Sequence, residues 1–525
     1  MYSRFAQRLA QLKKVSATTS LLAGSRIGLE KETLRVSPQG SISQTTHPEM
    51  LGAALTNPYI TTDYSEALLE LVTPPCDSVA SAMAFLSETQ KFVFTKLDDE
   101  MLWATSMPCV VAGETSIPIA QFGSSNAGMM KTVYRRGLGH RYGRVMQVIA
   151  GVHFNYSLSA DFWQTYQKSE GSHADAQSFI NEGYFAILRN LQRLGWLVPY
   201  LFGASPAVCK SFLGDTPTSL QDFDENTYYE EYATSLRMGD IGYQNNKENE
   251  TGIKANYDNL EKYVDSLSRA ISTPCPEYEK IGIEVGGEYR QLNANILQIE
   301  NEYYSTVRPK QVPDGNEKPV SALKSRGVEY IELRSLDVNA FEPLGVSETQ
   351  LYFLEAFVLF CLLADSPPID DRERDEIDNN ELETAHRGRD PKLQLQRNGE
   401  SVFLKDWGIE VVTAMQGVCE LLDGNAEGQP YQDALAEQAA AIHNPELTPS
   451  AIMLKKMREQ DEGFYHFARR MSVQHRDYFS STEISAQSNK LMEDTARQSV
   501  LRQQEIEESD KISFAEYLAC YFDSK

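Results

Sequence analysis

Several segments of the chain alternate apolar and polar residues with a period of two, which predicts β-strands. The strands expected in this way cover residues 26–36, 151–158, 280–292 and 328–337. In the third, Gly286-Gly287 is a fitting two-residue hairpin turn, because glycine takes positive φ without steric cost. Helical spacing of apolar residues predicts helices at about 79–99, 175–194, 258–271, 347–363, 404–422, 430–442 and 485–507.

This order of elements favours an α+β fold, with a mainly antiparallel sheet flanked by helices. A composition shift near Ser366 divides the chain. Residues 1–365 are expected to form a sheet-plus-helix core. Residues 366–525 are expected to be a mostly helical part that packs on the core or continues it as one domain. Between the two we expect a charged loop over residues 370–397.

The first 29 residues contain no acid and five basic residues, which is weakly typical of a transit peptide. A surface helix with Phe5, Leu9 and Leu12 on its inner face explains the same residues, and this interpretation is preferred. No apolar run reaches the roughly 18 residues of a membrane span. The best candidate, residues 351–364, is too short and contains Glu355.

Charge and cysteine content narrow the function classes. The 525 residues include 49 Lys and Arg against 74 Asp and Glu, a net charge of −25. Such a chain is a poor non-specific ligand for nucleic acid or an anionic membrane. The seven cysteines are scattered and form no C-x-x-C, so neither a disulfide framework nor a cysteine zinc site is indicated. A reducing cytoplasm fits this pattern best.

Pairs of acids on expected strands are the first candidates for chemistry. Glu30 and Glu32 face the same side of a strand, with Cα atoms about 6.6 Å apart. Two such carboxylates repel unless a cation or an arginine lies between them, and this arrangement suits Mg²⁺. Asp63 precedes an apolar stretch in which Glu66 and Glu70 share a face. A solvated strand face with incidental acids is the alternative.

Two further same-face pairs and one arginine are also candidates for the site. His153 shares a strand face with Asn155, and Glu332 shares one with Arg334. A hydrogen-bonded structural histidine and a plain ion pair are the alternatives to a metal or phosphate site. Arg237, which follows an apolar run and precedes two glycines, is the least routine of the basic residues. The usual Gly-rich nucleotide motifs are absent, so bound phosphate would meet metal and arginine instead.

Long motifs in the chain resemble those of bacterial glutamate–cysteine ligases, of the type found in gamma-proteobacteria. They are Gly28-Leu-Glu-Lys-Glu-Thr-Leu-Arg35, Ile60-Thr-Thr-Asp-Tyr-Ser-Glu-Ala-Leu-Leu-Glu70, Pro199-Tyr-Leu-Phe-Gly-Ala-Ser-Pro206, Tyr232-Ala-Thr-Ser-Leu-Arg237, Gln298-Ile-Glu-Asn-Glu302 and Tyr330-Ile-Glu-Leu-Arg-Ser-Leu-Asp337. They follow the family's order over roughly residues 20–365. The last 160 residues match the family less in sequence than in length and helical character.

The resemblance implies a fold similar to the glutamine synthetase catalytic domain, in which the curved sheet forms a funnel. It implies ATP-dependent joining of the L-glutamate γ-carboxylate to the L-cysteine amine through a γ-glutamyl phosphate, the first step of glutathione biosynthesis. By resemblance, the Mg²⁺ or Mn²⁺ ligands are Glu30, Glu32, Asp63, Glu70, His153 and Glu332. Contacts to phosphate and substrate anions are Arg135, Arg237 and Arg334. The cysteine pocket contains Tyr64, Tyr134, Gln147, Tyr243 and Tyr304.

The same resemblance implies a cytoplasmic monomer with glutathione as a feedback inhibitor. Tyr64 departs from the family, which has Phe at this place, so the chain adds a hydroxyl to the cysteine pocket. The residues themselves support the chemistry, since bringing ATP and a carboxylate together requires several cations. Three alternatives stay open at this point: a ligase with another amine acceptor, a metal-dependent hydrolase, and a non-catalytic binding protein.

Overall fold

A computed structural model describes residues 2–15, 18–242, 254–315, 317–424 and 426–523. Its centre is a seven-stranded sheet in which every pairing is antiparallel. The strand order is β11-β12-β5-β1-β3-β2, with β4 paired to β1. The strands are β1 (Arg26–Val36), β2 (Ile60–Thr62), β3 (Leu68–Val72), β4 (Met101–Leu102), β5 (Gly151–Ser157), β11 (Val307–Lys310) and β12 (Tyr330–Asp337). The expected α+β architecture with a mainly antiparallel sheet is therefore confirmed.

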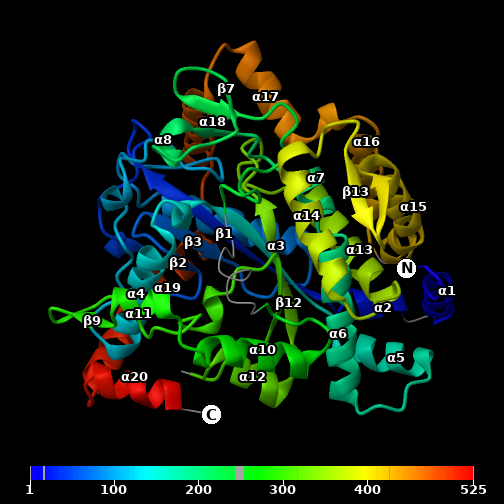
Figure 1. The fold of residues 1–525 in the computed structure, drawn as a ribbon, viewed down its shortest axis with the longest axis horizontal. Coiled ribbons are helices and arrows are strands. Elements are labelled where there is room, and N and C mark those ends of the chain that lie inside the picture. The colour runs from blue at the N-terminus through cyan, green and yellow to red at the C-terminus, as the bar shows by residue number, and fades with distance from the viewer. Residues whose placement is uncertain (1, 16–17, 243–253, 316, 425, 524–525) are drawn as a thin grey trace.

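Helices surround the central sheet (Figure 1). Those before residue 365 are α1 (Phe5–Lys14), α2 (Thr18–Leu22), α3 (Val79–Phe94), α4 (Asn126–Tyr142), α5 (Ala160–Glu170), α6 (Ala176–Arg193), α7 (Leu197–Phe202), α8 (Lys210–Leu213), α10 (Leu260–Ser272), α11 (Pro276–Ile281), α12 (Pro319–Arg326) and α13 (Glu348–Leu363). Those after it are α14 (Asp371–Arg387), α15 (Leu404–Asp423), α16 (Pro430–His443), α17 (Pro449–Glu459), α18 (Phe464–Ser480), α19 (Ala486–Ser509) and α20 (Phe514–Asp523).

Within the described residues, three small sheets lie outside the central one. They are β6 (Ala207–Cys209), β8 (Thr227–Tyr229) and β7 (Gln221–Asp222), then β9 (Glu284–Val285) with β10 (Glu288–Tyr289), and β13 (Gln394–Arg397) with β14 (Glu400–Phe403). Gly286 and Gly287 form the expected turn of the second, with φ of 65° and 84°. The expectation of one long strand over 280–292 is wrong. This segment contains the end of α11 and then the two short strands β9 and β10.

Helix α13 shows how the core is built. Almost all of its residues are apolar, so it is buried on every side rather than along one stripe. Ser347 begins it with a capping box that involves Gln350. It packs against α6 on one side and against α15 and α16 on the other, which joins the later helices to the sheet-bearing part. Among the described residues, no helix has both the length and the apolar character needed to cross a bilayer.

The N-terminal segment forms the expected helix. In α1, Phe5 and Leu12 are buried and Leu9 is partly buried against the core, so the preferred interpretation as a surface helix is confirmed.

Two expectations about the rest of the chain are wrong. Most of the segment 370–397 is the helix α14 rather than a charged loop. Its inward stripe contains the polar residues Glu376, Asn380 and Thr384, so it produces no apolar periodicity. In addition, Cys109 and Cys209 form a disulfide with Cα atoms 5.5 Å apart. They are 100 residues apart in sequence, and only the fold brings them together. The cysteine pattern therefore no longer argues for a reducing compartment.

Candidate active site

The expected metal ligands lie on one face of the central sheet because of its register. Glu30 on β1 is opposite His153 on β5, and Glu32 is opposite Glu70 on β3. Glu332 on β12 is opposite Asn155. Directly opposed residues of antiparallel strands project from the same face, so four strands present these side chains to one space. The same-face geometry expected for Glu30 and Glu32 is confirmed.

These side chains converge around His153. Its Nδ1 lies 2.9 Å from Oε2 of Glu30 and 3.6 Å from Oε1 of Glu332. Its Nε2 lies 3.5 Å from Oε1 of Glu32. Ligand atoms of Glu30, His153 and Glu332 all lie within 4.8 Å of one another. Two carboxylates and an imidazole at this spacing are a donor set that a divalent cation accepts.

The protein shifts the pKa values of the clustered acids in opposite directions. Burial raises the pKa of Glu70 well above its usual value, and the charges of Glu30, Asp63 and Glu32 raise it further. Burial opposes ionisation of Glu332 as well, but Arg334 and Lys310 outweigh it and hold the pKa of that carboxyl well below its usual value. The sheet face therefore holds more buried acid than its own cations neutralise, which is the electrostatic condition for binding a cation.

Arg237 and Arg334 are packed together beside the acids. Nη1 of Arg334 contacts Oε1 of Glu332 at 2.8 Å. Arg237 is 2% exposed, and its Nη2 donates to the carbonyl of Arg334 at 2.9 Å. Asp337 lies 3.6 Å from Nη1 of Arg237 and is held by Ser205 and Ser235. Because both guanidiniums have fixed partners, they form a rigid pair of donors for an anion.

Arg135 reaches the same cavity from α4. Its guanidinium lies 4.4 Å from the ring centroid of Phe122 and donates to the carbonyl oxygen of Asp63. This contact joins α4 to the loop between β2 and β3, which carries Asp63 and Tyr64. Two of the three expected arginines therefore belong to the sheet side of the site, and the third approaches from the helix opposite.

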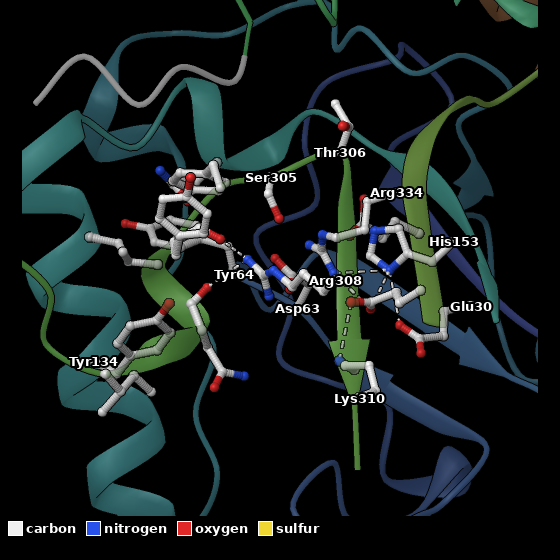
Figure 2. A pocket seen from close by; sticks show the side chains of 18 of the residues that line it. Glu30, Asp63, Tyr64, Tyr134, His153, Ser305, Thr306, Arg308, Lys310 and Arg334 are labelled. Atoms are coloured by element: carbon white, nitrogen blue, oxygen red, sulfur yellow. Dashed lines mark hydrogen bonds and ion pairs between the residues drawn. The ribbon is translucent and has the colours of Figure 1, made fainter. Parts of the chain in front are cut away.

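Aromatic side chains form the other end of the site. Figure 2 shows Tyr64 and Tyr134 on one side, facing Glu30, His153 and Arg334 across the pocket. The hydroxyl of Tyr304 donates to Oε1 of Gln147 at 2.7 Å. Nε2 of Gln147 is buried and has no hydrogen-bond partner among the described residues. Tyr243, also expected here, lies outside the described residues.

All of these groups line one continuous cavity of about 850 Å³. It contains every described residue of the expected metal, anion and acceptor sets. The sequence analysis missed two kinds of residue. Arg308 and Lys310 were not among the expected site residues, yet both line the cavity; Arg308 is 8% exposed, and Nζ of Lys310 lies 3.2 Å from Oε2 of Glu332. The sequence did contain a clue to them, because Arg308 and Lys310 are two residues apart, as are Glu332 and Arg334.

The second missed group belongs to α14. From this helix, six residues line the cavity: Arg374, Ile377, Asp378, Asn379, Glu381 and Leu382. They were missed because the segment was interpreted as a loop. No sequence pattern relates them to the sheet.

Comparison with known proteins shows the family to which the chain is similar. A profile of the glutamate–cysteine ligase family matches residues 9–384. Curated glutamate–cysteine ligases of Alcanivorax borkumensis and Pseudomonas putida are each 46% identical, over 98% and 97% of this chain and 99% and 97% of theirs. The crystal structure of a Francisella tularensis glutamate–cysteine ligase in complex with AMP superposes with a TM-score of 0.89 at 37% identity, covering 95% of this chain and 97% of that one.

A more distant likeness is to a bifunctional glutathione synthetase from Pasteurella multocida. Its TM-score is 0.74 at 25% identity, over 94% of this chain and 58% of that chain. The family resemblance of the motifs is thus confirmed over nearly the whole length. With the matching profile, the relatives and the converging site residues together, the chain belongs to the glutamate–cysteine ligase family.

Proposed function

We propose that this cavity joins the γ-carboxylate of L-glutamate to the amine of L-cysteine, while ATP is converted to ADP and phosphate. This is the first step of glutathione biosynthesis. The observation that carries the proposal is the cavity itself. It brings together an acid–imidazole cluster, two guanidiniums on the sheet side, a third guanidinium from α4, and a pocket of tyrosines with an unpartnered amide.

Glu30, His153 and Glu332 would hold Mg²⁺ or Mn²⁺, with Glu32, Asp63 and Glu70 as further ligands on the same face. The residues fit such an ion, because ligand atoms of Glu30, His153 and Glu332 lie within 4.8 Å of one another, and because burial and the neighbouring acids raise the pKa of Glu70. When bound, the cation neutralises charge on the phosphate oxygens of ATP. Oxygen-rich sites of this kind serve ATP enzymes generally.

The arginines are proposed to stabilise the transferring phosphoryl group. Arg237 and Arg334 present fixed N–H donors, so they need no reorganisation when charge develops on phosphate oxygens. Arg135 would pair with an anionic end of the substrates from the α4 side. Attack of the glutamate γ-carboxylate on ATP gives γ-glutamyl phosphate and ADP.

The tyrosine end is proposed to bind cysteine. Tyr64, Tyr134 and Tyr304 surround the thiol with polarizable rings, which sulfur favours. The free Nε2 of Gln147 would donate to the cysteine carboxylate, since a buried donor without a partner is costly. The cysteine amine, once deprotonated, attacks the γ-carbonyl, and phosphate leaves. No cysteine of the chain takes part in these steps.

A coupled assay for ADP, with each substrate omitted in turn, tests the proposal. ADP release that needs both glutamate and cysteine supports it. Release with glutamate and another amine in place of cysteine would show a different ligase. Hydrolysis without ATP would show the hydrolase, and no turnover with any combination would leave only a binding protein.

We also propose the finer properties that the family implies. These are a sheet curved into a funnel like that of the glutamine synthetase catalytic domain, a monomer in the cytoplasm, and inhibition by glutathione at the substrate cavity. A division at residue 365 is proposed as well, with the later part contributing α14 to the cavity wall. Sedimentation analysis and inhibition kinetics against glutamate test the monomer and the inhibition.

A further inference from the structure

The last helix of the chain, α20, forms part of the cavity wall. Tyr517 and Tyr521 lie about one helical turn apart on α20, and both line the cavity. Figure 1 shows α20, in red, beside α4, and the two helices are in contact. The groups assigned to metal, phosphate and cysteine all precede residue 335, so this wall of two tyrosines, the α20 wall, has no assigned role.

A small apolar cluster, separate from the main core, attaches α20 to α4. Phe514 and Leu518 of α20 are buried in this cluster together with Val133 of α4 and Leu292. Tyr134, which Figure 2 shows in the pocket, packs against the same cluster. Tyr134 therefore contacts the apolar cluster of α20 on one side and the cavity on the other.

Helix α4 connects the α20 wall to the expected cysteine pocket. Ala127, Met130, Lys131, Tyr134 and Leu138 of this helix all line the cavity. Their spacing of three, four or seven residues places them along one face of the helix. The lining thus continues along α4 from the tyrosine end of the cavity to the part of the helix nearest its N-terminus.

Polar contacts fix the segment before α20 to the N-terminus of α4. The carboxylate of Asp510 accepts the backbone N–H of Asn126, and the side-chain amide of Asn126 donates to the carbonyl of Ile512 at 3.0 Å. A carboxylate is favourable at a helix N-terminus, because the first N–H groups have no partner within the helix. The start of α20 is thereby anchored to the helix that carries Tyr134 and Arg135.

The other end of α20 is fixed as well. Nζ of Lys318 donates to the carbonyl of Phe522 at 3.0 Å and lies 5.6 Å from the ring centroid of Tyr521. A lysine at a helix C-terminus is favourable, because it bonds a carbonyl that the helix leaves unpaired. With both ends anchored, the rings of Tyr517 and Tyr521 have a defined place in the cavity wall.

The chemistry of an acyl phosphate gives such a wall a task. The cysteine amine attacks the γ-carbonyl of γ-glutamyl phosphate, and phosphate leaves. Water attacks the same carbon, expels phosphate in the same way and returns glutamate, so that one ATP is consumed without product. A ligase must therefore admit cysteine at the acceptor end of its cavity while it excludes bulk water. Packed aromatic rings exclude water without offering it hydrogen-bonding groups along their faces.

We propose that α20 closes the acceptor end of the cavity, where Tyr517 and Tyr521 exclude water from γ-glutamyl phosphate and the cluster around Phe514 positions Tyr134. This inference rests on the proposed ligation. It assigns to the last helix the coupling of ATP consumption to amide formation, and it makes Phe514 a positioning residue for the cysteine pocket.

The test measures γ-glutamylcysteine formed per ADP released, and ADP release when cysteine is omitted. Wild type should form close to one dipeptide per ADP. Tyr517→Ala and Tyr521→Ala open the wall and should each raise cysteine-independent ADP release about 5-fold or more. They should lower the yield of dipeptide per ADP and leave KM for ATP unchanged. Tyr517→Phe keeps the ring and should retain the wild-type yield.

A second set of variants tests the positioning role. Phe514→Ala should raise KM for cysteine by about tenfold, the equivalent of about 1.4 kcal/mol, with no change in KM for ATP. Phe514→Leu keeps a buried apolar side chain and should restore KM for cysteine. Cys520→Ala changes an exposed side chain of the same helix and is the matched control, expected to behave as wild type.

Thermal unfolding identifies the variants that are folded. A folded Tyr517→Ala/Tyr521→Ala double variant with the wild-type yield of dipeptide per ADP would overturn the exclusion of water by α20. An equal rise in KM for ATP, glutamate and cysteine in Phe514→Ala would show a general structural role and overturn the positioning of Tyr134. A wild type that releases no ADP with glutamate and cysteine would instead overturn the proposed function.

Discussion

Gly151 offers a sharp test of how Arg237 is positioned. It is the first residue of β5, it has no positive φ, and its N–H donates to Oε2 of Glu32 at 2.7 Å. Alanine fits this backbone and keeps the hydrogen bond. An alanine Cβ, however, would lie 2.1 Å from Nη2 and 2.8 Å from Cζ of Arg237. Gly151→Ala therefore perturbs one guanidinium without changing any functional group.

The size of the effect follows from these distances. Non-bonded heavy atoms rest at about 3.5 Å or more, so the guanidinium must move by at least about 1 Å. Such a shift also breaks the 2.9 Å hydrogen bond from Nη2 to the carbonyl of Arg334. Misplacing a catalytic group by about 1 Å costs roughly 10²-fold in rate. We expect Gly151→Ala to lower kcat for ADP release by about that factor, while KM for cysteine changes little.

The assay is ADP release at saturating glutamate and cysteine over a range of ATP. Gly28→Ala is the matched control, because Gly28 is on the neighbouring strand and its added Cβ would meet Cβ of Asn155 at 3.3 Å, which a shift of a few tenths of an ångström relieves. Thermal unfolding of both variants shows whether the sheet is intact. Wild-type turnover in a folded Gly151→Ala enzyme would refute the placement of Arg237 at the reacting phosphate.

Three further outcomes are expected. Glu30→Gln and Glu332→Gln should each lower ADP release sharply, with partial recovery of one of them at high Mg²⁺; near-normal activity of both at ordinary Mg²⁺ would contradict metal ligation. The acceptor preference should be cysteine, then 2-aminobutyrate, then serine, because a serine hydroxyl without a partner costs about 1–3 kcal/mol, or roughly 5- to 150-fold in kcat/KM; equal use of serine would show a polar pocket. Glu230 and Asp240 lie 2.7 and 3.0 Å from the two ring nitrogens of His386 and, against the effect of burial, raise its pKa above 6.5. Its contribution to the free energy of unfolding is therefore complete below pH 6.5 and lost as pH rises through the raised pKa; urea unfolding at several pH values should show this loss in wild type, and an identical pH dependence in His386→Gln would exclude it.

The sequence alone determined which residues of a strand share a face. Alternation with a period of two relates residues i and i+2, so Glu30 with Glu32, and Glu332 with Arg334, were predictable as pairs. It also determined the long apolar helices, of which α13 is the clearest, because a segment that must be buried on all sides is recognisable from its composition alone. Motif resemblance then added the family and the remaining candidate site residues.

Only the tertiary structure decided how these pairs meet. The register of β1 against β3 and β5 sets Glu30 opposite His153 and Glu32 opposite Glu70, and that choice depends on contacts between segments far apart in the chain. Helix α14 escaped prediction because its inward stripe is satisfied by hydrogen bonds, such as that of Asn380 to the carbonyl of Gln396, rather than by apolar burial. Glu381 belongs to the same helix, so from the sequence it was only one charged residue of an expected loop. Its place in the cavity wall, and the pKa of about 8 to which burial raises its carboxyl, exist only in the folded chain.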